Sequence, residues 1–316
     1  MQNTVIQTSP PSILERAQGS LVGLACGDAI GTSVEFSPRG SFPTVTDMYG
    51  GGVFNLKPGE WTDDTSMALC LAESLIHSKG FNPTDQMNRY CNWYQYGYLS
   101  SNGTCFDIGN TVRSALEKYL KTSDPYSGST HPNSAGNGSI MRLAPVAIYY
   151  YKNINELIHF AAESSRTTHG SLECLESCQL LATQLSLALT GADKDSIIAA
   201  SRLNPFQSEK VQSIHQGDWK QLNYEQLIGS GYVIESLQAS LWCFYYSESF
   251  SDAVLKATNL GDDADTTAAI TGQLAGAYYG INNIPENWQQ KIVMNEEIKT
   301  MAMSLLKDEN KHASIT

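Results

Sequence analysis

The sequence is poor in basic residues. Only 20 of its 316 residues are Lys or Arg, against 32 Asp and Glu, which gives a formal net charge of −12. Because no stretch is rich in Lys and Arg, we expect no binding to the phosphate backbone of a nucleic acid. Charged residues make up 16% of the chain, below the usual quarter, so the positions of the acidic residues are informative.

Signals for membranes and secretion are also missing. The polar start of the chain has no charged segment followed by an apolar one, so it is not a secretory signal. The most apolar late segment, 268–280, is too short to span a bilayer. Seven scattered cysteines without a CxxC pair are typical of reduced thiols. We therefore expect a cytoplasmic protein that does not bind membranes.

Three enzyme signatures are absent from the sequence. It contains no HExxH, no GxSxG and no GxxxxGK[ST], and no Cys–His group has the spacing of a zinc site. These absences argue against zinc peptidases, hydrolases built on a nucleophile elbow and nucleotide-binding P-loops.

Alternating strand patterns are almost absent, and apolar residues mostly recur at helical spacing. A capping box, Ser12 to Glu15, opens the first helix. Further helices are predicted over 64–78, 84–96, 110–121, 154–165, 171–190, 231–246, 250–258, 266–279 and 295–307. The glycine-rich segment 42–56 has room for a few short strands.

No linker divides the chain, so we expect one compact all-α domain over 12–308. Residues 1–11 are expected to form a flexible polar tail, and 309–316 a flexible C-terminus. The segment 122–138 is a long loop of small polar residues, and loops of this length are often functional or mobile.

Two predicted helices carry a line of glycines at intervals of four residues. These are Gly19, Gly23, Gly27 and Gly31 in the first helix, and Gly272, Gly276 and Gly280 in the later one. Glycine allows two helices to approach closely because it has no Cβ. We therefore expect these two helices to pack against each other.

Each of two clusters of acidic residues stands just before or at the start of a helix. The first is Thr62-Asp63-Asp64, which capping and metal binding explain equally well when it is taken alone. The second contains Asp262, Asp263 and Asp265, followed by Thr266, which is more carboxylate than a cap requires. Oxygen ligands of this kind suit hard cations such as Mg²⁺ or Mn²⁺, and the spacing is not that of an EF-hand. Packing of the glycine-lined helices would unite the clusters into a two-cation site able to activate water.

Four other segments contain polar groups of weaker meaning. Glu35, between two apolar residues, is more often structural, and Asp107 stands in an ordinary turn before a helix. The glycines, amide and hydroxyl of 136–142 could bind phosphate, although a flexible loop end explains them slightly better. A lone histidine such as His169 is usually structural.

Taken together, the motifs resemble the ADP-ribosylglycohydrolase family, and especially its bacterial dinitrogenase-reductase-activating branch. The matching stretches follow the family order from residue 21 to residue 280. They are LVGLACGDAIGTSVEF, KPGEWTDDTSMALCLAESL, FDIGNTVRSAL, AGNGSIMRLAPVA, TTHG, GSGYVIESLQ and NLGDDADTTAAITGQLAGAYYG.

The resemblance implies an orthogonal helical bundle with a binuclear Mg²⁺ or Mn²⁺ centre. The implied metal ligands are Thr62, Asp63, Asp64, Asp263, Asp265 and Thr266. Asp262 is left out because relatives often have glycine at that position. The implied catalytic residues are Asp107 and Glu35, of which Asp107 is preferred for activating water. The implied substrate-binding residues are Asn137, Gly138, Ser139, His169 and Tyr232.

The resemblance also implies the activity. The expected enzyme is an ADP-ribosylarginine hydrolase, which cleaves the N-glycosidic bond between ADP-ribose and a modified protein arginine. Family members also act on serine and O-acetyl linkages. One alternative is an immunity protein that neutralises an ADP-ribosylating toxin, by reversing the modification or by covering the toxin's active site. Another is a non-catalytic ADP-ribose-binding protein, against which the two intact aspartate clusters argue.

Overall fold

The structure is a computed structural model that describes residues 9–200, 203 and 205–307. Within these residues the chain forms α-helices and short 3₁₀ turns, without any strand. The α-helices are α1 (Ile13–Gly31), α2 (Asp63–Ser78), α3 (Pro83–Tyr96), α4 (Asn110–Thr122), α5 (Ala144–Tyr150), α6 (Ile154–Arg166), α7 (Leu172–Leu189), α8 (Lys194–Ala199), α9 (Glu209–Gln216), α10 (Val233–Tyr245), α11 (Phe250–Thr258), α12 (Ala264–Tyr279), α13 (Glu286–Lys291) and α14 (Asn295–Lys307). The 3₁₀ turns are η1 (Pro132–Ser134), η2 (Asp218–Gln221), η3 (Tyr224–Gln226) and η4 (Ile281–Asn283).

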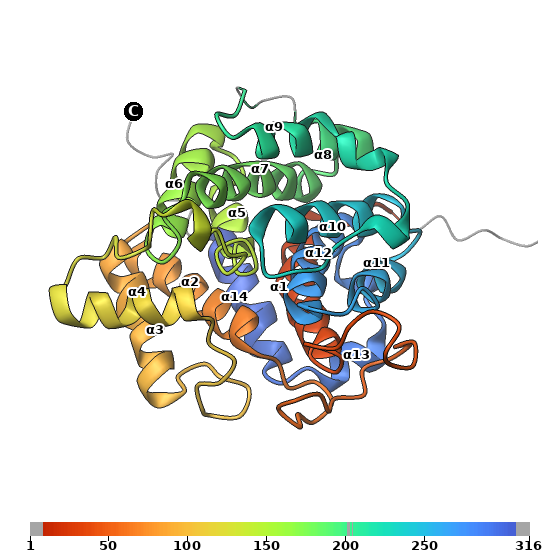
Figure 1. The fold of residues 1–316 in the computed structure, drawn as a ribbon, viewed down its shortest axis with the longest axis horizontal. Coiled ribbons are helices and arrows are strands. Elements are labelled where there is room, and N and C mark those ends of the chain that lie inside the picture. Colours follow the sequence, from red (N-terminus) through yellow and green to blue (C-terminus); the bar gives the residue numbers. More distant parts are fainter. Residues whose placement is uncertain (1–8, 201–202, 204, 308–316) are drawn as a thin grey trace, which may run out of the picture.

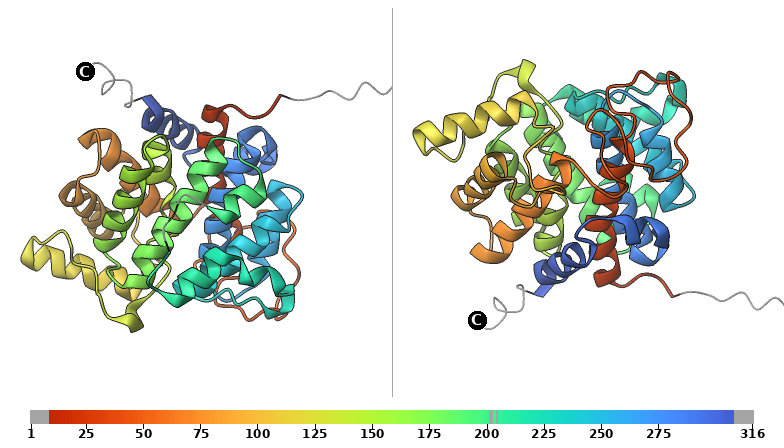
Figure 2. Two further views of the ribbon diagram at one scale, coloured as in Figure 1. Left: turned by 90° about the horizontal axis from the view of Figure 1, so that it is seen from above. Right: turned by 90° about the horizontal axis from the view of Figure 1, so that it is seen from below.

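Helices α1 and α12 form the centre of the molecule (Figure 1). Views from above and below place α2, α3 and α4 on the opposite side of this pair from α10 and α11 (Figure 2). Most residues of both central helices are buried. Helices buried on nearly every side show no single apolar face, which accounts for their weakly amphipathic sequences.

The glycine lines make this central contact possible, as the sequence predicted. A Cβ added at Gly272 would collide with the carbonyl oxygen of Gly23, and one at Gly276 with that of Gly19. Near the other end, the last glycine of the α1 line, Gly31, lies against the backbone of Asp265. The close approach therefore fixes the start of α12 directly beside the end of α1.

The ten predicted helices all form, with ends close to those expected. Sequence patterns missed α5, which is wholly buried, and the short helices α8, α9 and α13. The expected strands of 42–56 are reduced to one bridge between Gly51 and Leu56. The predicted flexible ends fall mainly outside the described residues, since only residues 9–11 of them are included.

The loop over 122–138 is held to the rest of the fold. Its segment Pro132–Ser134 forms η1, and single bridges join Ser129 to His169 and Gly136 to Tyr232. Among the described residues, no helix combines the length and the apolar character that crossing a membrane requires.

Candidate active site

A cavity of about 770 Å³ opens where the N-termini of α2 and α12 meet the segments that precede α4 and α5. Its lining contains six acidic side chains and no Lys or Arg. The acidic residues are Glu35, Asp63, Asp107, Asp262, Asp263 and Asp265. So many carboxylates in one cavity repel one another unless protons or cations compensate for them.

The start of α2 is fixed by Asp28, a fully buried residue of α1. One carboxylate oxygen of Asp28 accepts hydrogen bonds from the backbone N–H and the hydroxyl of Thr62, both at 2.9 Å. The other oxygen accepts from the same two groups of Thr65, at 3.0 and 2.6 Å. Because Asp28 satisfies these donors, the helix start does not depend on Asp63 or Asp64 as caps. Of the two explanations for that acidic pair, the geometry favours a ligand role.

The two acidic clusters meet where the starts of α2 and α12 lie side by side. The hydroxyl of Thr62 lies 3.4 Å from Oδ2 of Asp265, and the hydroxyl of Thr266 lies 3.4 Å from Oδ2 of Asp64. A 3.5 Å contact between the Thr62 hydroxyl and Oδ2 of Asp64 links these pairs. Four of the six predicted ligands, Thr62, Asp64, Asp265 and Thr266, therefore form one connected group. Asp63 and Asp263 line the same cavity, and Oδ2 of Asp263 accepts a 2.6 Å hydrogen bond from the side-chain amide of Asn137.

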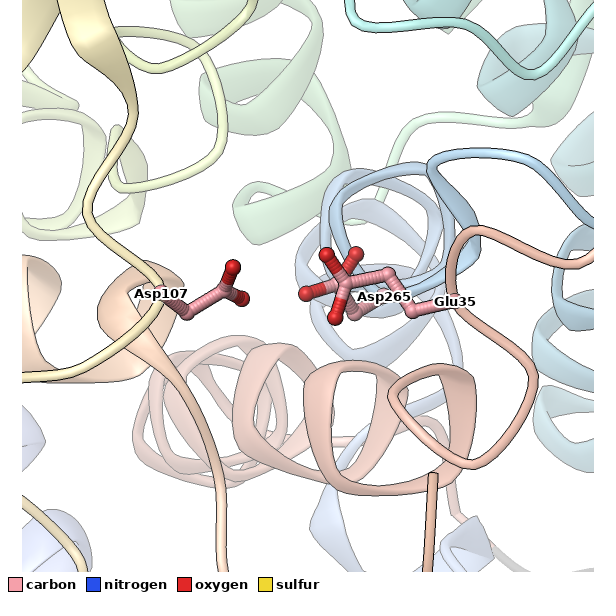
Figure 3. A group of neighbouring side chains, drawn as sticks. All are labelled: Glu35, Asp107 and Asp265. Carbon is pink, nitrogen blue, oxygen red and sulfur yellow. The ribbon is translucent and has the colours of Figure 1, made fainter. Parts of the chain in front are cut away.

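The two predicted catalytic carboxylates lie with Asp265. One oxygen from each of Glu35, Asp107 and Asp265 lies within 4.8 Å of the other two. Figure 3 shows Asp107 approaching from the opposite side of the cavity to Glu35 and Asp265. Asp107 adopts a left-handed backbone conformation, with φ of 58°, and such conformations in non-glycine residues are often found at functional sites.

Burial and mutual repulsion disfavour ionisation throughout this cluster. Burial, together with the charge of Asp107, raises the pKa of Glu35 to about 9. Burial also raises the pKa of Asp107 to about 7. The same cause, reinforced by neighbouring carboxylates, places the pKa values of Asp63, Asp64 and Asp265 well above their usual range. A bound cation would reverse these shifts.

The donor set fits a hard divalent cation. Among the described residues, two buried carboxylate oxygens have no hydrogen-bond partner, Oε2 of Glu35 and Oδ1 of Asp64. In the same part of the chain no ion pair involves the carboxylates of the cavity. Buried carboxylates without donors or counter-charges are the oxygen ligands that Mg²⁺ and Mn²⁺ prefer.

The predicted substrate-binding residues divide into two groups. Asn137, Gly138 and His169 line the cavity. The hydroxyl of Ser139 lies outside the cavity lining and contacts Ser165 at 2.9 Å. Tyr232 lines a smaller cavity of about 530 Å³ that shares residues such as Gly136 with the first.

His169 lines the cavity and is held by a buried hydrogen-bond chain. Arg142 donates a 2.6 Å hydrogen bond to the hydroxyl of Thr168, and that hydroxyl lies 2.8 Å from Nδ1 of His169. Burial and the nearby Arg142 charge lower the pKa of His169 to about 3, so the ring is neutral. Because Arg142 only donates to the Thr168 hydroxyl, that hydroxyl keeps its own hydrogen available for Nδ1, and when it donates there the ring proton is on Nε2.

Sequence reasoning missed two parts of the site. Asp28 was noted within its motif without a role, although a carboxylate inside a helix of small apolar residues was a usable signal. Asp262, which was left out of the ligand set, lines the cavity at its exposed edge.

The fold and the cavity define an all-helical protein whose acidic site could hold a metal ion for hydrolytic chemistry. The sequence model of the ADP-ribosylglycohydrolase family matches residues 9–314. The chain belongs to the ADP-ribosylglycohydrolase family.

Curated relatives and a solved structure agree with this assignment. ADP-ribosylarginine hydrolase Tri1 of Pseudomonas putida is 44% identical, over 96% of this chain and 81% of its own length. Tri1 of Serratia proteamaculans is 46% identical, over 92% and 79%. The ADP-ribosyl-[dinitrogen reductase] glycohydrolase of Rhodospirillum rubrum is 32% identical, over 91% and 93%. A solved structure described as an ADP-ribosylglycohydrolase-related protein complex superimposes with a TM-score of 0.84 and 41% identity, over 94% of this chain and 99% of that chain.

Proposed function

We propose that this hydrolase cleaves the N-glycosidic bond between ADP-ribose and a protein arginine, and so reverses mono-ADP-ribosylation. The observation that carries the proposal is the meeting of Glu35, Asp107 and Asp265 within 4.8 Å in a cavity large enough for a nucleotide-sized ligand. The choice of arginine rests on the two relatives named ADP-ribosylarginine hydrolase. The seven free cysteines fit a reducing compartment, so we place the reaction in the cytoplasm.

Two divalent cations, Mg²⁺ or Mn²⁺, would complete the site. We assign them to the six oxygen-bearing residues Thr62, Asp63, Asp64, Asp263, Asp265 and Thr266. When bound, the cations would polarise the distal ribose hydroxyls and lower the pKa of a water molecule. The hydrogen bond from Asn137 to Asp263 then holds one ligand carboxylate in place.

The carboxylates at the centre of the cavity perform the chemical step. As the bond to the guanidine nitrogen breaks, positive charge develops at the anomeric carbon of the ribose, and nearby carboxylates stabilise it. Asp107 stands across the cavity from Glu35 and Asp265 and positions or deprotonates the attacking water. Glu35 faces the ribose and cations from the other side.

The diphosphate of ADP-ribose has suitable donors on the far wall. Within the described part of the chain, the backbone N–H groups of Gly138 and Ser139 have no protein acceptor. Successive free N–H groups form an anion site. Gly138 lines the cavity and would donate directly, whereas Ser139, the next residue, is not itself part of the lining. Nε2–H of His169 adds a donor to the same wall, and Tyr232 borders the adjoining smaller cavity.

The experiment that tests this function follows ADP-ribose release from an arginine-ADP-ribosylated protein with Mg²⁺ or Mn²⁺. We expect release that EDTA abolishes and that the Asp63→Ala, Asp263→Ala double variant lacks. The control is Glu248→Gln, which changes an exposed carboxylate outside this cavity and should retain the activity. A wild-type protein that releases ADP-ribose only from serine or O-acetyl linkages would contradict the choice of arginine.

An ADP-ribosyltransferase toxin is the partner that we propose for this reaction, because such an enzyme must create the substrate. The similar solved structure is described as a protein complex. If the protein inhibits the toxin by binding over its active site, the Asp63→Ala variant should still inhibit it. If the protein reverses the modification, the Asp63→Ala variant should not. Binding and turnover measured side by side in that variant separate the two modes.

A further inference from the structure

An aromatic residue stands at the mouth of the cavity in a strained and exposed position. Phe36 directly follows Glu35, lines the cavity and is 62% exposed. Its φ of 59° lies in the left-handed region, which is a genuine outlier for a bulky residue. A large apolar side chain that is both strained and exposed gains nothing for the fold, and such strain is often found at ligand sites.

Asp262 holds Phe36 in this position and adds a charge beside it. The N–H of Phe36 donates to the carbonyl of Asp262 at 2.7 Å, and the N–H of Asp262 donates to the carbonyl of Ser37 at 2.9 Å. Asp262 is itself left-handed, with φ of 55°, and its exposed side chain lines the cavity. Among the described residues, its carboxylate has no hydrogen-bond or ion-pair partner. These two backbone hydrogen bonds therefore place the aromatic face of Phe36 and the free carboxylate of Asp262 together at one edge of the cavity mouth.

The position of this edge decides which part of a substrate can reach it. The buried carboxylates Glu35 and Asp265 stand deeper in the cavity, where the scissile bond must lie. A modified protein has to remain outside, so its side chain leaves the cavity past groups that are exposed at the mouth. Phe36 directly follows Glu35 and Asp262 directly precedes Asp263, and both of these carboxylates line the cavity.

We propose that Phe36 and Asp262 form the subsite for the departing arginine side chain, an inference that rests on the proposed function. A guanidinium group is planar and cationic, stacks on aromatic faces and pairs with carboxylates. Phe36 covers the guanidinium plane, and Asp262 pairs with its charge. A serine side chain is neutral and offers neither interaction, so the two residues select arginine over serine.

The test compares two peptides of matched sequence, one ADP-ribosylated on arginine and one on serine. For Phe36→Ala and Asp262→Asn we expect kcat/KM on the arginine peptide to fall about tenfold, as for the loss of a partly desolvated cation–aromatic contact. The ratio of kcat/KM on the arginine peptide to kcat/KM on the serine peptide should fall with it. Asparagine tolerates the left-handed backbone, so Asp262→Asn changes charge without added strain. Raising the salt concentration should slow the wild-type reaction with arginine more than that of Asp262→Asn.

Three controls separate binding of the side chain from other effects. Phe36→Tyr keeps the aromatic face and should keep the ratio. Tyr96→Ala removes an exposed aromatic residue (76% exposed) that does not line this cavity, and should also keep the ratio. The affinity for free ADP-ribose, measured by calorimetry, should be the same in all variants. An active wild type whose Phe36→Ala and Asp262→Asn variants retain the ratio, or lose both activities equally, would overturn the subsite. A wild type without activity on the arginine peptide would instead contradict the proposed function, and the subsite with it.

Discussion

Asp28 holds the start of α2, where we propose that metal binds, and does not line the cavity. We therefore expect Asp28→Asn to weaken metal binding. Its carboxylate accepts four hydrogen bonds, two from Thr62 and two from Thr65. Asparagine has the same shape but only one acceptor oxygen. Its amide nitrogen would face one of the two backbone N–H groups, which then has no acceptor.

The stability cost follows from that unpaired group. A buried N–H without an acceptor costs about 1–3 kcal/mol. Burial disfavours the charged carboxylate of Asp28 and raises its pKa. A neutral amide does not carry this desolvation cost, which offsets part of the loss from the unpaired N–H. We expect a net loss of about 2 kcal/mol, or a Tm lower by roughly 4 °C in a protein of this size. Displacement of Thr62 and the adjacent ligands should weaken Mg²⁺ or Mn²⁺ binding by about 10–100-fold, as for other residues that support metal ligands.

Calorimetric titration of the metal and thermal unfolding in EDTA measure the two effects separately. Glu176→Gln is the matched control, because the buried Glu176 carboxylate accepts the N–H groups of Gln207 and Ser208 at 2.8 Å, away from the cavity lining. It should lower Tm without changing metal affinity. Our reasoning would be refuted by an Asp28→Asn protein that is destabilised yet binds metal like the wild type.

Two further predictions concern the helix contact and the carboxylate cluster. Gly272→Ala should destabilise the protein by about 2 kcal/mol, because overpacking of about 3 kcal/mol against the Gly23 carbonyl exceeds a gain of about 1 kcal/mol in helix propensity. Gly109→Ala is the control, since its added Cβ meets open space, and it should leave Tm unchanged in the same thermal unfolding assay. Equal Tm values for the two variants would contradict the close packing of α1 and α12. In EDTA, Tm should fall as the pH rises from 6 to 9, because Asp107 and Glu35, with pKa values of about 7 and about 9, hold protons in the folded state that the unfolded chain has released above about pH 4. Saturating Mg²⁺ should remove this fall in Tm. A Tm that rises with pH in EDTA would contradict the predicted direction of the pH dependence.

The long helices were predictable because their periodic apolar residues and end signals are local. Ser12 and Glu15 form the predicted capping box, and both glycine lines pack as expected. Helix α5 escaped prediction because it is short and buried on all sides, so it has no polar face to set a period. Helices α8, α9 and α13 are equally short, with six to eight residues, and tertiary packing rather than propensity stabilises such segments.

The site was predictable only in part from the residues themselves. Two aspartate clusters at helix starts suggested cations, and the glycine lines explained how clusters about 200 residues apart could meet. Glu35 and Asp107 drew attention through the family resemblance, since each stands alone in an ordinary local sequence. Only the three-dimensional arrangement shows that both converge on Asp265.

The close contact between α1 and α12 also positions the carboxylate cluster. Gly31 lies against Asp265, and three residues earlier in α1 Asp28 holds Thr62 and Thr65. The end of α1 therefore positions both halves of the site. Gly31, which has no side chain, allows the start of α12 to approach, and the buried Asp28 carboxylate holds the start of α2. The close packing of α1 and α12 fixes the start of α12, and with it Asp265, beside the end of α1. The free energy that such a site gains on binding a cation is thus prepared by the packing of α1 and α12, which a substitution far along the glycine line can disturb.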